Sequence, residues 1–122
     1  MVLDEFAVLG DAITTFGEKA QEAMLLEEMS ELQKEICKRW RGKDNVAEIA
    51  EEIADVEIML DQIKMIFCCA GRVRAIRASK IRRLEERIRE TRGNDTSSVS
   101  RLAGDGDCHL PLKGKALEEA EA

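Results

Sequence analysis

Apolar residues recur at steps of three or four along residues 46–67, and this spacing restricts the segment to one kind of structure. A step of three or four brings side chains to one face of an α-helix. Alanines, together with Ile58 and Met59, widen the apolar surface beside the main stripe. We therefore expect a central helix that is packed on more than one side. The main stripe, at steps of 4, 3, 4, 3 and 4, consists of Ile49, Ile53, Val56, Leu60, Ile63 and Phe67.

Three other segments have the same helical period. We expect helices over residues 2–16, 18–40 and 72–92, with a break in the first near Gly10. Aromatic residues make up only 3% of the chain and there is a single Pro, so the core must be built from aliphatic side chains. These features predict an all-α fold, a four-helix bundle-like protomer whose core is completed by oligomerisation. The residues expected to face inward on the fourth helix are Val73, Ile76, Ile81, Leu84 and Ile88.

Glycines and capping residues mark the expected helix ends. Gly17 and Gly71 are predicted breaks, and Gly42 is the predicted C-cap of the helix over residues 18–40. Asp44 or Asn45 is the expected N-cap of the helix that follows. After Gly93 the helical period disappears and small polar residues prevail. We thus expect a helical domain over residues 1–92 and a flexible C-terminal tail over residues 93–122.

Charge is unevenly distributed. The chain has a net charge of −6, yet residues 72–92 contain nine Arg or Lys against three Glu. An acidic body with one basic helix is a poor partner for duplex DNA but suits a small anion held beside cations. No apolar run approaches the ~18 residues of a membrane span, so we expect no membrane partner. The start of the chain has no basic leader, and a cytoplasmic location is expected.

The cysteines do not indicate a metal site. Cys37, Cys68, Cys69 and Cys108 form no Cys-x-x-Cys, and the single histidine is His109. This spacing argues against zinc and favours reduced, half-buried thiols.

Two pairs of carboxylates stand at the edges of the apolar stripes. Glu28 and Glu31 are three residues apart on one expected helix, and Glu52 and Asp55 are three apart on the next. Residues at this spacing share a helix face, so folding the helices together would gather four carboxylates. Such a cluster repels itself unless cations bind, and all-oxygen sites suit Mg²⁺ or Mn²⁺. Hard ions in turn suggest phosphate chemistry.

Acidic pairs also occur on ordinary solvated helices, where Lys or Arg usually follows at the third or fourth position. Glu31 has such a partner in Lys34, but the other three acids have none. The segment over residues 48–61 contains six acids and no Lys or Arg. A di-iron site would need Glu-x-x-His pairs, and a calcium EF-hand would need its loop of spaced acids. Neither pattern is present in this sequence.

The acidic motifs resemble those of a known family. Glu27-Glu28-Met29-Ser30-Glu31, followed by Glu52-Ile53-Ala54-Asp55, is similar to the motif of MazG-type all-α nucleoside triphosphate pyrophosphohydrolases, particularly the short single-domain phage type. The resemblance covers about residues 12–91. It implies Mg²⁺-dependent hydrolysis of a nucleoside triphosphate to the monophosphate and pyrophosphate, and assembly into a dimer or tetramer. It also implies that Glu28, Glu31, Glu52 and Asp55 hold the metal and that Glu27 acts beside them or orients water.

The sequence leaves open which residues contact the substrate. Arg77, Lys80 and Arg83 share a face of the basic helix, where they would contact phosphates or simply balance the acidic neighbouring helix. The resemblance favours Lys80 and Arg83 as phosphate contacts. Two further candidates to approach the nucleotide are Lys19 and Gln21.

Two questions stay open at this level. Trp40, between Arg39 and Arg41, could stack on a base, although a single Trp at a helix end more often covers a core or an interface. The alternative to an enzyme is a non-catalytic helical oligomer that binds a nucleotide or a regulatory partner. Intact carboxylates at all four motif positions favour the enzyme.

Overall fold

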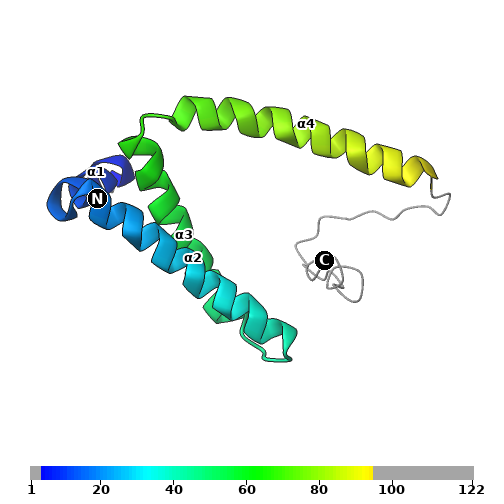
Figure 1. Ribbon diagram of the computed structural model, residues 1–122, viewed down its shortest axis with the longest axis horizontal. Coiled ribbons are helices and arrows are strands. Elements are labelled where there is room, and N and C mark those ends of the chain that lie inside the picture. Colours follow the sequence, from blue (N-terminus) through cyan, green and yellow to red (C-terminus); the bar gives the residue numbers. More distant parts are fainter. Residues whose placement is uncertain (1–3, 95–122) are drawn as a thin grey trace. The chain divides into compact units, whose positions relative to one another are not determined.

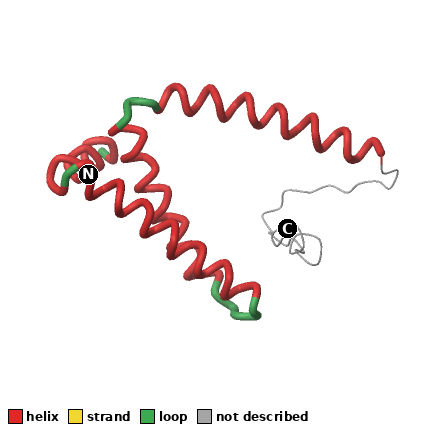
Figure 2. Tube along the Cα trace, viewed as in Figure 1, coloured by secondary structure: helices red, strands yellow, loops and turns green. Residues whose placement is uncertain are grey.

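The computed structural model describes residues 4–94, and this part of the chain is entirely helical (Figure 1, Figure 2). No strand occurs within it, which confirms the all-α prediction. None of its helices is both long enough and apolar enough to cross a membrane. The predicted tail falls, from residue 95 onward, outside the described residues. The four helices are α1 (Glu5–Phe16), α2 (Glu18–Trp40), α3 (Val46–Ile66) and α4 (Ala70–Asn94).

Two of the predicted breaks were wrong. Helix α1 runs without interruption through Gly10, since one glycine inside a helix costs only about 1 kcal/mol relative to alanine. Gly71 lies within the first turn of α4, and the break comes earlier, at Cys68, whose φ of 51° ends the helical conformation. The N–H of Cys69 bonds to the carbonyl of Lys64 to close α3, and the N–H of Val73 bonds to Cys69 to open α4.

The chain divides into two compact units, Met1–Arg82 and Arg83–Ala122, with the boundary inside α4. In the first unit α2 and α3 form an antiparallel hairpin, and α1 packs on both of them (Figure 1). Helix α3 contacts both α1 and α2, as expected for a helix packed on more than one side. Helices α1 and α2 each contact two helices as well, so these contacts do not single out α3 as central.

The predicted inward stripe of α4 is not buried. Within the first unit, the described part of α4 packs on none of the other three helices, and Val73 and Ile76 are 38% and 47% exposed. In the second unit Leu84 and Ile88 are exposed as well. The periodicity defines an apolar face on this helix, but within the first unit none of α1, α2 and α3 covers that face.

The contact between α2 and α3 is unusually polar. Among the described residues Met59 is the one buried apolar side chain, at 6% exposure, whereas Gln21 and Gln62 are buried too. The Gln21 amide Nε2 donates to Gln62 Oε1 at 2.7 Å, and Gln62 Nε2 donates to the Met59 sulfur at 3.7 Å. A buried amide without a hydrogen-bond partner is costly. This pair therefore favours one alignment of α2 and α3 over shifted alignments.

The turn between α2 and α3 is tightly built. Gly42 adopts a φ of 100°, and its N–H donates to the carbonyl of Arg39 at 2.9 Å, while the N–H of Lys43 donates to Lys38 at 3.1 Å. These bonds close α2 in the pattern that favours glycine after a helix end. The C-cap residue is Arg41, one position before the predicted Gly42. Asn45 follows at 2% exposure, and its Nδ2 donates to the backbone carbonyl and to the carboxylate Oε1 of Glu35, at 2.9 and 2.7 Å.

Replacing Asn45 should loosen this turn. Asn45→Ala removes two hydrogen bonds to Glu35, and we expect the free energy of unfolding to fall by about 1–2 kcal/mol. Urea denaturation followed by circular dichroism, at fixed protein concentration, measures this change. Asp44→Ala is the matched control, because the Asp44 side chain is 99% exposed and its ion pair with Arg39 is a surface pair. An equal loss of stability in both variants would contradict the stabilising role of the hydrogen bonds from Asn45 to Glu35.

Candidate metal centre

The hairpin register brings the predicted acids together. Gln21 and Gln62 face each other, and Glu28 lies seven residues after Gln21 while Asp55 lies seven before Gln62. Seven residues are about two helical turns, so each acid stays on the same face as its glutamine. Since the helices run in opposite directions, the same two turns lead toward the same point. Glu28 and Asp55 are thereby placed across the helix contact from each other.

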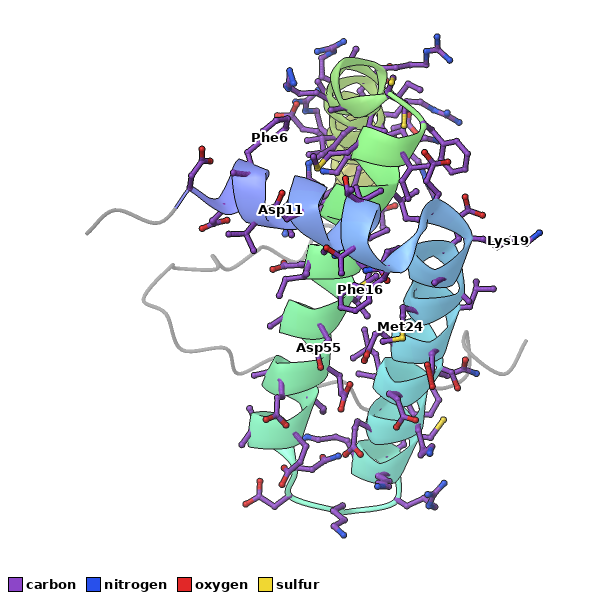
Figure 3. The ribbon with its side chains drawn as sticks, turned by 90° about the vertical axis from the view of Figure 1, so that its left-hand side faces the viewer. Phe6, Asp11, Phe16, Lys19, Met24 and Asp55 are labelled. Atoms are coloured by element: carbon purple, nitrogen blue, oxygen red, sulfur yellow. The ribbon has the colours of Figure 1, made fainter. Side chains whose placement is uncertain are left out.

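Three carboxylates converge at this point. Glu28, Glu52 and Asp55 each contribute one oxygen, and the three oxygens all lie within 4.8 Å of one another. All three side chains are half-buried. Figure 3 shows Asp55 on α3, on the side where α2 and α3 face each other. We call Glu28, Glu52 and Asp55 the acid cluster.

The structure sets Glu31 beside the acid cluster rather than in it. Its carboxylate pairs with Lys34 at 3.5 Å, along the same helix. Its charge nevertheless contributes to raising the pKa of both Glu28 and Glu52. Glu27 is exposed and also raises the pKa of Glu28. Of the four predicted metal ligands, three meet and the fourth is paired close by.

The surroundings of the acid cluster disfavour the charged form of its carboxylates. Partial burial raises the pKa of Glu28 above its ordinary value, and Asp55, Glu27 and Glu31 raise it further. Partial burial also raises the pKa of Glu52, with added contributions from Asp55 and Glu28. Within the part of the chain that the structure describes, no Lys or Arg pairs with any cluster member. Among residues 4–94, the three carboxylates thus stand together with no Lys or Arg paired to them.

The donor set fits a hard divalent cation. Two opposite oxygen ligands of Mg²⁺ stand about 4.2 Å apart, and those of Ca²⁺ about 5 Å apart. Three ligands cannot all lie opposite one another, and adjacent oxygens around octahedral Mg²⁺ stand only about 3 Å apart. The three oxygens, which lie within 4.8 Å of one another, would therefore move closer together to bind Mg²⁺. Carboxylate oxygens alone suit Mg²⁺ or Mn²⁺ better than softer metals. Thiols take no part, because the cluster contains no cysteine.

The predicted substrate-binding residues occupy different settings. Lys19 is exposed near the start of α2, whereas Gln21 is engaged in the buried amide pair and presents no open surface. Arg77 and Lys80 are exposed on α4 in the first unit. Arg83 is exposed in the second unit.

Two apolar side chains stay exposed in the first unit. Phe16 ends α1 and is 64% exposed, and Met24 on α2 is partly exposed as well. Figure 3 shows Phe16 and Met24 on the face of the hairpin that α1 crosses.

The fold and site therefore define an all-α protein with an acidic candidate metal centre in a helical hairpin. No family model, curated protein sequence or solved structure gives a match to this chain. The resemblance to MazG-type enzymes accordingly rests on the motif residues themselves.

The raised pKa values predict a pH dependence of stability. The folded state raises the pKa of Glu28 and Glu52 above 4.5, so it binds their protons more tightly than the unfolded chain does. The free energy of unfolding of the metal-free protein should therefore increase as the pH falls from 7 toward 4.5. Hydrogen bonds from Asn45 and Lys38 lower the pKa of Glu35, and its contribution is lost as the pH falls further.

Urea denaturation at several pH values in metal-free buffer measures this profile. The double variant Glu28→Gln/Glu52→Gln lacks the two titrating groups, and its stability should change less between pH 7 and pH 4.5. A wild-type profile that declines steadily from pH 7 would contradict the repulsive character of the acid cluster.

Proposed function

We propose that the protein is a Mg²⁺-dependent nucleoside triphosphate pyrophosphohydrolase of the MazG type. It would convert an NTP or dNTP to the monophosphate and pyrophosphate. The observation that carries this proposal is the convergence of Glu28, Glu52 and Asp55, whose oxygens lie within 4.8 Å of one another with no Lys or Arg of the described residues paired to them. Uncompensated charge at a helix contact destabilises a fold, which makes a structural role for the three acids a poor explanation.

The residues of the site have distinct proposed tasks. The acid cluster and Glu31 would hold Mg²⁺, with Mn²⁺ as a substitute. Bound there, the metal would neutralise triphosphate oxygens and lower the pKa of the attacking water. Glu27, the exposed neighbour of Glu28, would orient water and accept its proton. Lys80 and Arg83, with Arg77, are the proposed phosphate contacts, and Lys19 is a candidate at the nucleotide.

Self-association belongs to this proposal. Large apolar side chains remain exposed on every helix, among them Leu26 at 66% on α2 and Ile53 on α3. Such surface is normally covered by another copy in a homo-oligomer. We propose a dimer, with a tetramer as the alternative assembly. Light scattering coupled to size-exclusion chromatography would distinguish these from a monomer.

A substrate panel tests the activity. Ribo- and deoxyribonucleoside triphosphates are incubated with the full chain and Mg²⁺, and the products are separated by ion exchange. Monophosphate and pyrophosphate in equal amounts, lost on removal of the metal, are the expected result. Release of orthophosphate would indicate a different reaction. Nucleotide binding without any product would favour the non-catalytic helical oligomer.

A further inference from the structure

The turn between α2 and α3 collects positive charge on an otherwise acidic protein. Residues 38–43, which we call the basic tip, contain four cations and no acid, although the chain has a net charge of −6. A surface hollow opens among them, lined by Lys38, Arg41, Gly42 and Lys43. Three of its four lining residues are cations, so the hollow is suited to an anion.

Two of these cations are available to a ligand. Lys38 pairs with Glu35 at 3.0 Å, and Arg39 pairs with Asp44 at 3.4 Å. Arg41 and Lys43 are exposed and form no ion pair with any residue in the range 4–94. Guanidinium and ammonium groups with no internal partner are the groups that bind phosphate.

An exposed aromatic ring lies next to these cations. Trp40 is the last residue of α2, immediately before Arg41, and it is 47% exposed. Trp40 does not line the hollow itself, but consecutive Cα atoms are about 3.8 Å apart, so a nucleotide with its phosphate at Arg41 is long enough for its base to reach the exposed Trp40 ring. Stacking on an aromatic side chain is tolerant of the identity of the base.

The basic tip is also preorganised. The backbone bonds from Gly42 and Lys43 close α2, and the buried Asn45 holds the start of α3 against Glu35. A ligand would meet cations that already project from a fixed turn, which reduces the entropy lost on binding.

The charges around the tip restrict the size of the ligand. Asp44 follows directly, and the first turns of α3 present Glu48 and Glu51 beside a second hollow. A long polyanion or an anionic lipid surface would extend from the tip over these carboxylates and be repelled. A mononucleotide would cover the tip alone.

We propose that the basic tip is a second nucleotide site, independent of metal, with a phosphate between Arg41 and Lys43 and the base on Trp40. The site is separate from the acid cluster. On α2, Lys38 is ten residues from the cluster member Glu28, or about 15 Å along the helix. Nucleotide binding at the basic tip does not depend on the proposed hydrolysis.

The single Trp of the chain reports directly on this binding. The sequence has one Trp and no Tyr, so intrinsic fluorescence comes from Trp40. ADP in metal-free buffer should quench this fluorescence in a saturable manner. Adenosine, which lacks phosphate, and pyrophosphate, which lacks the ring, should each bind at least tenfold more weakly by competition. Absence of ADP quenching, or quenching only with Mg²⁺, would overturn the proposal.

Paired variants separate the site from general charge. Arg41→Gln/Lys43→Gln should weaken ADP binding at least tenfold, whereas Arg72→Gln/Arg74→Gln, which removes the same charge from α4, should leave it unchanged. Calorimetry with Trp40→Ala should show a similar loss, and Trp40→Phe should largely restore binding because the ring remains. Circular dichroism checks the fold of each variant. Equal weakening in both double variants would overturn the proposal.

The other ligands that a basic, aromatic turn could take are tested in the same buffer. A ten-residue oligo(dT) or vesicles containing phosphatidylserine should bind more weakly than ADP. Tighter binding of either one, lost in Arg41→Gln/Lys43→Gln, would replace the mononucleotide with a nucleic acid or a membrane.

Discussion

Asp55→Asn should abolish the release of pyrophosphate while leaving the helical signal intact. Asp55 contributes to the acid cluster and raises the pKa of both Glu28 and Glu52. Its replacement by a neutral amide removes a ligand charge from the proposed Mg²⁺ site without a change in size. We expect kcat/KM to fall by about 10³-fold, within the range known for the loss of a group acting in the transition state.

Two further variants define the limits of this result. Glu31→Gln should also abolish turnover, although Glu31 lies beside the cluster and is paired with Lys34. Glu57→Gln, an exposed acid on the same helix as Asp55, should keep nearly wild-type activity. Full activity in both Asp55→Asn and Glu31→Gln would rule out the proposed site, whatever the substrate.

Mg²⁺ should raise the melting temperature of the protein by roughly 10–20 °C at saturation. A ligand at about 100 times its Kd stabilises the folded state by ~2.7 kcal/mol, and each kcal/mol shifts Tm by about 4–8 °C in a domain of this size. The physical reason is that the cation relieves repulsion among carboxylates that folding brings within 4.8 Å. Differential scanning fluorimetry with and without Mg²⁺ measures the shift.

The same measurement on Glu52→Gln should give the opposite pattern. Removing one charge from the cluster should raise Tm in metal-free buffer and reduce the shift produced by Mg²⁺. Sodium chloride of equal ionic strength controls for screening, and Glu57→Gln controls for the loss of an acid. A wild-type shift no larger than the sodium shift would contradict a metal role for the cluster.

Local features were predictable from the sequence. The span of α2 was predicted correctly at both ends. Its helical period, the break at Gly17 and the glycine at position 42 all depend only on residues close together in the sequence. The placement of Glu28 and Glu52 at the edge of a buried face came from the same period. Helical hydrogen bonds join residues four apart, so a short window of sequence contains most of what decides a helix.

The tertiary structure alone decided which side chains meet. Gln21 and Gln62, separated by 41 positions in the sequence, pair in the helix contact, and this register is what brings Glu28 opposite Asp55. The same packing gives α4 no partner among α1, α2 and α3 within the first unit. Contacts between distant residues depend on how the side chains of two helices pack together, and the period of either helix does not predict that packing.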